Sequence, residues 1–177
     1  SLDPDKIYFI PIAIADATPY PIVKKKGNAL LQIQKKNKYT SSAEPASYNA
    51  SGYEGSGYFV ITKTMVPLTK NRVRINIGTK RLPAEPENQP DFIKKNTIVI
   101  EVADDNSLTV EPYDPEEMEV ETVDVKVAHP GDNAYALYNN RLDPTTTTFC
   151  VCYKYRLKTG SWTEVREAIR LPVIVIE

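Results

Sequence analysis

Apolar and polar residues alternate along much of this chain in short runs, which is the pattern of β-strands. In the run RVRINIG, residues 72–78, Val73, Ile75 and Ile77 alternate with polar side chains. Successive side chains of a strand point to opposite faces of a sheet. The run therefore predicts a strand with one buried face and one face in solvent.

Similar runs recur after residue 57 and predict about eight strands. They span residues 58–65, 71–79, 96–103, 107–113, 120–128, 134–140, 147–157 and 163–171. Turn-forming stretches such as ADDNS, HPGDN and KTGS separate them, and short connections favour antiparallel neighbours. The last run also has apolar residues at helical spacing, but a strand is the favoured interpretation. We predict an all-β fold, an antiparallel meander that closes as a β-barrel or β-sandwich.

Two further runs, 6–14 and 28–36, predict a pair of strands near the N-terminus. Two strands bury too little surface to be stable alone, so this pair should pack on the remainder, on a partner chain or on residues outside this chain. Residues 39–57 are rich in Ser, Gly, Pro and Ala, which is typical of a linker. The predicted organisation is a two-strand unit at 1–38, a linker at 39–57 and a β-domain at 58–177.

Composition narrows the function classes. Lys and Arg number 22 against 23 Asp and Glu, so the chain has no net basic field to attract nucleic acid. No apolar run approaches the roughly 18 residues that a membrane-spanning helix needs. The terminal run LPVIVIE, residues 171–177, predicts instead a short apolar strand that must be covered and is expected to pair with the N-terminal unit.

Cys150 and Cys152 are the first candidates for site chemistry, because they are spaced i, i+2. On a strand they point to the same face about 6.5–7 Å apart, which is too far for a disulfide. A structural zinc site needs four ligands, and His129 is the only histidine. We expect no metal and no cofactor, and we interpret the two cysteines as packed side chains on a strand that is covered on both faces.

The remaining candidates are aromatic. Trp162 lies beside a turn, and the segment YALYNNR mixes aromatic, amide and cationic side chains. Packing is the expected role of most of them, but flat aromatic faces with adjacent polar groups also bind sugars. The predicted ligand-binding residues are Trp162, Tyr135, Tyr138, Asn140 and Arg141. No nucleophile and base, or pair of carboxylates, stands out as catalytic, so we do not expect an enzyme.

Two stretches carry a family resemblance. LDPDKIYFIPIAIADA followed by NALLQIQKKNKY resembles the closing strands of an Ig-like domain of unknown function that is common in secreted Bacteroidetes lipoproteins. YNNRLDPTTTTFCVCYKYRLKTGSWTEVREAIRL resembles the C-terminal strands of the β-barrel or sandwich domains that follow it. The resemblance implies that the N-terminal unit is a two-strand remnant of an Ig-like domain.

The resemblance also implies a setting. Such proteins are exported, attached to the outer membrane or cell surface by a lipid anchor that this chain lacks, and encoded beside polysaccharide-uptake systems. The expected function is a non-catalytic glycan-binding or accessory protein, whose partners are a polysaccharide or oligosaccharide and proteins of the uptake system, without nucleic acid. A barrel that encloses a small apolar, lipid-like ligand and a surface assembly module are the alternatives.

Overall fold

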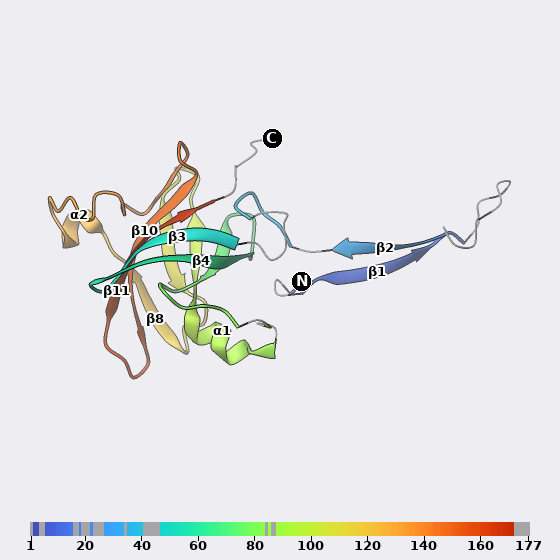
Figure 1. The fold of residues 1–177 in the computed structure, drawn as a ribbon, viewed down its shortest axis with the longest axis horizontal. Coiled ribbons are helices and arrows are strands. Elements are labelled where there is room, and N and C mark those ends of the chain that lie inside the picture. Colours follow the sequence, from blue (N-terminus) through green and yellow to red (C-terminus); the bar gives the residue numbers. More distant parts are fainter. Residues whose placement is uncertain are drawn as a thin grey trace. The chain divides into compact units, whose positions relative to one another are not determined.

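Antiparallel strands dominate the computed structural model (Figure 1). The structure describes residues 2–3, 6–15, 18, 22, 27–33, 35–40, 47–83, 85 and 88–171, and the predicted strand at 171–177 lies almost wholly outside them. The chain divides into two compact units, Ser1–Lys35 and Lys36–Glu177.

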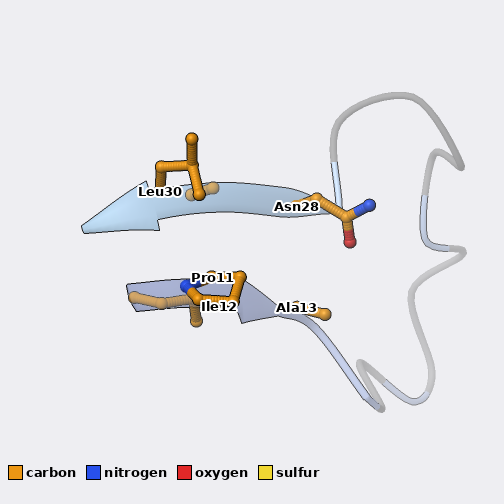
Figure 2. Close-up of a pocket in the computed structure, with 6 residues that line it drawn as sticks. Pro11, Ile12, Ala13, Asn28 and Leu30 are labelled. Carbon is orange, nitrogen blue, oxygen red and sulfur yellow. The ribbon is translucent and has the colours of Figure 1, made fainter. Parts of the chain in front are cut away.

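The first unit is a two-stranded ribbon. Strands β1, Tyr8–Ala13, and β2, Asn28–Ile33, pair antiparallel, as the sequence pattern predicted. Their apolar side chains lie in solvent on both faces, with Leu30 70% exposed on one face and Ile12 48% exposed on the other. An open hollow of about 560 Å³ lies against this ribbon (Figure 2) and is lined by Pro11, Ile12, Ala13, Asn28, Ala29 and Leu30.

The second unit is a nearly closed barrel-like sheet, which confirms the predicted fold class. Its strands are β3 (Ser47–Glu54), β4 (Gly57–Pro67), β5 (Arg72–Asn76), β6 (Thr97–Val102), β7 (Leu108–Pro112), β8 (Met118–Thr122), β9 (Arg141–Asp143), β10 (Thr148–Leu157) and β11 (Thr163–Arg170). Two short helices, α1 (Pro90–Asn96) and α2 (Val125–Ala128), interrupt the series. The strand order is β7-β6-β5-β4-β3-β11-β10-β8, with β9 beside β10.

The side chain of Thr122 links β7 to β8, the two ends of this order, and backbone hydrogen bonds between residues 106–108 and 140–142 close the sheet beside it. Thr122 of β8 accepts a hydrogen bond from the backbone N–H of Val110 in β7 at 2.7 Å, and its hydroxyl donates back to the Val110 carbonyl at 3.1 Å. The hydroxyl thus replaces the ladder bonds that a full strand pairing would supply. The edges of β7 and β8 are therefore covered rather than left open.

The barrel interior is filled by apolar side chains. Phe149, Val151 and Tyr153 of β10 point inward and are fully buried. Cys150 and Cys152 lie on the opposite face of β10, where Cys152 packs with Val123, Val125 and Tyr138. Strand β10 is thus covered on both faces, and the packing role predicted for the cysteines is confirmed.

The predicted linker at 39–57 is wrong from residue 47 onward, and its residues 41–46 lie outside the described part of the chain. Residues 47–54 form β3, which lies in the middle of the sheet between β4 and β11. Tyr39 and Tyr48 are buried in the core. Gly52 is required for steric reasons, because a Cβ at this position would lie 2.0 Å from the carbonyl oxygen of Arg166 in β11.

Two further predicted strands are wrong, one because the segment forms turns and the other because a capped helix interrupts it. The run 134–140 forms turns that lead to Asn140, which has a positive φ of 54°. The run 120–128 is divided because Asp124 caps α2, its carboxylate accepting a hydrogen bond from the N–H of Lys126 at 3.0 Å. The last run, 163–171, is the strand β11 rather than a helix.

The solvated face predicted for β5 is also wrong. Arg74 and Asn76 are each only 1% exposed. The guanidinium of Arg74 lies 4.8 Å from the ring centroid of Tyr113, and the side-chain oxygen of Asn76 accepts a hydrogen bond from the N–H of Thr64. Polar residues can be buried when partners of this kind satisfy them.

A buried ion pair crosses the interior. The ammonium of Lys63 in β4 donates to the carboxylate of Glu167 in β11 and, at 2.9 Å, to the carbonyl of Asn76. Tyr153 donates to the other carboxylate oxygen at 2.9 Å, and its own hydroxyl accepts from the N–H of Gly78. Both charged side chains are 0% exposed, so burial lowers the pKa of Lys63, and Glu167 opposes that shift.

We predict that Glu167→Gln destabilises the barrel by about 3–5 kcal/mol, because it leaves the Lys63 ammonium buried without its counter-charge. Adding Lys63→Met should recover most of that loss, since the double variant removes both charges and still leaves an amide oxygen for the Tyr153 hydroxyl. Urea unfolding of the two single variants and the double variant measures the coupling. Losses that simply add would contradict the prediction.

We predict that Gly52→Ala destabilises the protein by about 1–3 kcal/mol or more, because the new methyl group meets the backbone of β11 and only a shift of the strands can relieve it. Gly57→Ala is the matched control: a Cβ at Gly57 meets no atom closer than 3.5 Å, so its effect should stay within about 0.5 kcal/mol. Thermal unfolding of the two variants distinguishes them. Equal losses of stability would contradict the steric explanation.

Candidate functional site

A cluster of tyrosines surrounds Arg166 on the outer face of the barrel. In β11, Glu167 points into the core, so the preceding Arg166 points outward. The strand register places Arg166 opposite Tyr53 in β3, and Tyr53 opposite Tyr58 in β4. Tyr135 and Tyr138 reach the same arginine from the segment that follows α2. We call these four tyrosines and Arg166 the tyrosine–arginine cluster.

Arg166 is held between aromatic rings. Its guanidinium carbon lies 4.3 Å from the ring centroid of Tyr53, 4.2 Å from that of Tyr135 and 5.9 Å from that of Tyr138. The rings of Tyr53 and Tyr58 are 5.2 Å apart and inclined by 58°. Each close contact between a cation and a ring stabilises the arrangement by about 0.5–2 kcal/mol. The cluster therefore binds the 129–138 segment to the sheet.

The guanidinium of Arg166 has no polar partner among the residues that the structure describes. Its Nε is buried without a hydrogen-bond acceptor, and no carboxylate there lies within ion-pair distance. Arg156, two strand positions beyond Lys154 on the same face, offers a comparison. It too has a buried, unpaired Nε and stacks on an aromatic ring, but its Nη2 binds Glu119 at 2.7 Å.

A second group of contacts fixes Tyr135. The ring of His129 stacks on it at 3.6 Å between centroids, with an interplanar angle of 9°. Glu164 of β11 accepts a hydrogen bond from the Tyr135 hydroxyl at 2.7 Å and lies 3.0 Å from Nε2 of His129. Burial, followed by the contact with Glu164, raises the pKa of Tyr135 to about 12.

Tyr58 is the most open member of the cluster, at 63% exposure. Tyr138 is the most covered, and burial raises its pKa. Arg166 opposes that rise, whereas the neighbouring phenols of Tyr53 and Tyr58 add to it. The cluster thus offers an exposed ring, several phenol hydroxyls and an unpaired cation within one small surface.

Of the five predicted ligand residues, the structure places two in the tyrosine–arginine cluster and three outside it. Tyr135 and Tyr138 belong to the cluster, whereas the ring of Trp162 contacts Lys154 and Arg156, whose charged groups lie 4.9 and 4.8 Å from its centroid. A ligand role for these residues stays a prediction.

The other two predicted residues make structural contacts. Asn140 braces the backbone, because its amide donates to the carbonyl of Val123 at 2.7 Å and its oxygen accepts from the N–H of Cys152 at 2.8 Å. Arg141 donates to the carbonyl of Asp105 at 2.7 Å. Neither contacts the tyrosine–arginine cluster in these interactions.

Sequence reasoning missed Tyr53, Tyr58 and Arg166. The signal for the two tyrosines was present in YEGSGY, where Gly55 has a positive φ of 58° and forms a tight turn that sets Tyr53 opposite Tyr58. The stretch was assigned to the predicted linker because residues 39–57 are rich in Ser, Gly, Pro and Ala. Arg166 could be added only by knowing that β11 pairs with β3.

The two cysteines supply no reactive site. Both thiols are free and buried. Burial raises the pKa of Cys150 to about 11 and that of Cys152 to about 12, above the ordinary value of 9.0. In the part of the chain that the structure describes, no three His, Cys, Asp or Glu side chains are grouped as metal ligands would be.

Comparison with known proteins gives a family but no activity. A family model described as "-like, C-terminal" matches residues 27–170. No curated protein matches the chain. Within the described residues, no helix has the length and apolar character that crossing a membrane requires.

Among the solved structures that the chain matches are three from Bacteroides ovatus. Two are structural-genomics proteins of unknown function. The first is 12% identical with a TM-score of 0.45, and the match covers 86% of this chain and 47% of that protein. The second is 14% identical with a TM-score of 0.47, and the match covers 99% of this chain and 62% of that protein. A multidomain protein including DUF1735 has 15% identity and a TM-score of 0.46, covering 96% and 59%. This chain thus spans about half to three-fifths of their lengths.

We predict that both thiols resist modification in the folded protein, because their raised pKa values keep them protonated. The same shifts predict a pH dependence. The unfolded thiols lose their protons near pH 9.0, whereas the folded ones hold them toward pH 11–12, so their contribution to stability is full below pH 9 and is lost as the pH rises through that window. Ellman's reagent with and without urea, and urea unfolding between pH 8 and 10, measure the two effects. Rapid labelling of the folded protein at pH 8 would contradict the prediction.

Proposed function

We propose that this chain, which belongs to the family described as "-like, C-terminal", is a non-catalytic domain that binds glycans. The tyrosine–arginine cluster is its binding surface, and its ligand is a polysaccharide or oligosaccharide. The resemblance to secreted Bacteroidetes lipoproteins supports an exported protein that is displayed at the cell surface beside a polysaccharide-uptake system.

The exposure of Tyr58 beside Tyr53 and Arg166 carries this proposal. A phenol ring that is 63% exposed offers a flat apolar face on which the C–H bonds of a sugar ring can stack. The hydroxyls of the neighbouring tyrosines and the N–H groups of Arg166 can bind sugar hydroxyls around that face. An open aromatic ring with converging polar groups is the usual composition of a ligand site.

The contacts of the single histidine support a binding role rather than a catalytic one. One face of the His129 ring is occupied by Tyr135, and its Nε2 faces Glu164. These contacts hold the 129–138 segment on the sheet. Affinity at one such surface can be weak, because display of many copies on a cell makes the binding multivalent.

The two alternative functions differ in their support. A barrel that encloses an apolar ligand loses support, since Phe149, Met65 and Ile100 are among the side chains that already pack together inside. A surface assembly module gains support from the exposed Phe9 and Leu30 of the ribbon. Light scattering over a range of concentrations tests assembly, and a monomer at every concentration would contradict it.

We predict that affinity electrophoresis against a panel of plant and host polysaccharides retards the protein, and that Tyr58→Ala weakens the binding about tenfold, equivalent to about 1.4 kcal/mol. Tyr58 is mostly exposed, so its removal should leave the thermal unfolding temperature unchanged. Tyr8→Ala, in the separate ribbon, is the matched control and should bind as the unmodified protein does. Absence of retardation by every polysaccharide would contradict the proposed function.

A further inference from the structure

We propose that Arg166 reads a carboxylate on the ligand, so that the glycan is an acidic one built with uronic acid residues. This inference rests on the proposed function and specifies its substrate class. Its basis is the combination of a charged guanidinium, rings that hold that group in place and the lack of a protein counter-charge.

The missing counter-charge distinguishes Arg166 from its neighbours. On the same outer face, Arg156 binds Glu119 at 2.7 Å and Lys154 binds Glu121 at 2.8 Å. Glu164 is only two positions from Arg166, yet its carboxylate is engaged by His129 and Tyr135. Glu164 is therefore engaged by other residues, and no carboxylate of the described chain pairs with the Arg166 guanidinium.

The rings of Tyr53 and Tyr135 determine what that guanidinium can bind. The guanidinium carbon lies 4.3 and 4.2 Å from their centroids, so the rings hold the cation in place, while the N–H groups along the edge of the guanidinium have no acceptor in the described chain. A carboxylate fits that edge with two parallel hydrogen bonds. Because the rings already order the Arg166 side chain, less side-chain entropy is lost when a ligand binds.

The position of Tyr58 fits a carboxylate that is carried on a sugar. Its ring lies 5.2 Å from that of Tyr53, so a pyranose stacked on Tyr58 would hold its substituents close to Arg166. Hydroxyls of the same sugar could meet the phenol of Tyr53, whose ring adjoins that of Tyr58. One uronic acid residue thus accounts for the stacking face, the phenols and the cation together.

Surrounding charge favours a sugar carboxylate over a polyphosphate. Glu119, Glu121 and Glu164 lie on or beside the same face, and the chain as a whole has a formal charge of −1. These acids disfavour any densely charged polyanion; a glycan can present a uronic acid to Arg166 with neutral sugars between its carboxylates, whereas a nucleic acid strand carries a phosphate on every nucleotide.

The test compares polygalacturonate, alginate and hyaluronan with the neutral, carboxyl-reduced form of each, by isothermal titration calorimetry on the unmodified protein. We expect at least one acidic form to bind about tenfold or more tightly than its reduced form. Equal binding of both forms would overturn the carboxylate proposal while leaving glycan binding intact. Binding of neither those polymers nor any glycan of the electrophoresis panel would overturn both.

Variants then assign the preference to one residue. Arg166→Lys keeps the charge but loses the planar fork, and it should abolish the preference for the acidic form. Arg156→Lys is the matched control, because that arginine shares the aromatic contact and the unpaired Nε but already has Glu119; it should retain the preference. Unchanged selectivity in Arg166→Lys, with a native unfolding temperature, would overturn the role of Arg166.

Two further probes separate the sources of negative charge. Dextran sulfate carries sulfate esters on a sugar, and a single-stranded oligonucleotide carries phosphates without the carboxylate. Tighter binding of either than of the best uronic acid polymer would overturn the assignment of a carboxylate. The comparison between acidic and reduced polymers uses the unmodified protein, so it holds even where a variant fails to fold.

Discussion

The buried pair of Lys63 and Glu167 is the interaction on which the rest of the barrel depends. It joins β4 to β11 across the intervening β3, and through Tyr153 and the carbonyl of Asn76 it also reaches β10 and the end of β5. Neither charge can be exposed to water without opening the barrel, so the pair specifies one arrangement of these strands. Because side chains alternate along a strand, fixing Glu167 inward also fixes Arg166 outward, and the core thereby sets the position of the proposed binding surface.

The close contact at Gly52 completes this coupling between core and surface. A residue without a side chain lets β3 approach β11 closely enough for full pairing. The next residue, Tyr53, is then carried to within 4.3 Å of the Arg166 guanidinium. The close packing of the β3 and β11 backbones thus determines the geometry of the tyrosine–arginine cluster. The loop that contributes Tyr135 packs on the surface that these strands form.

Much of the fold could be predicted from the sequence, whereas the cluster could not. Alternation of apolar residues located β4 to β8, β10 and β11, because that signal is local. It failed at Arg74, whose partners are distant in sequence, and over 47–54, where small residues required by packing resembled a linker. Tyr135 and Tyr138 were found by composition alone. Their association with Arg166 depends on strand register and loop docking, which are properties of the tertiary structure.

The pairing of β3 with β11 also has a kinetic consequence. The first strand of the barrel finds one of its two neighbours only when the last strand is available. Contacts between such distant segments must overcome a large loop-closure entropy, which makes folding slow. During synthesis the growing chain therefore carries β3 and β10 each with an unpaired edge until residues 163–170 emerge.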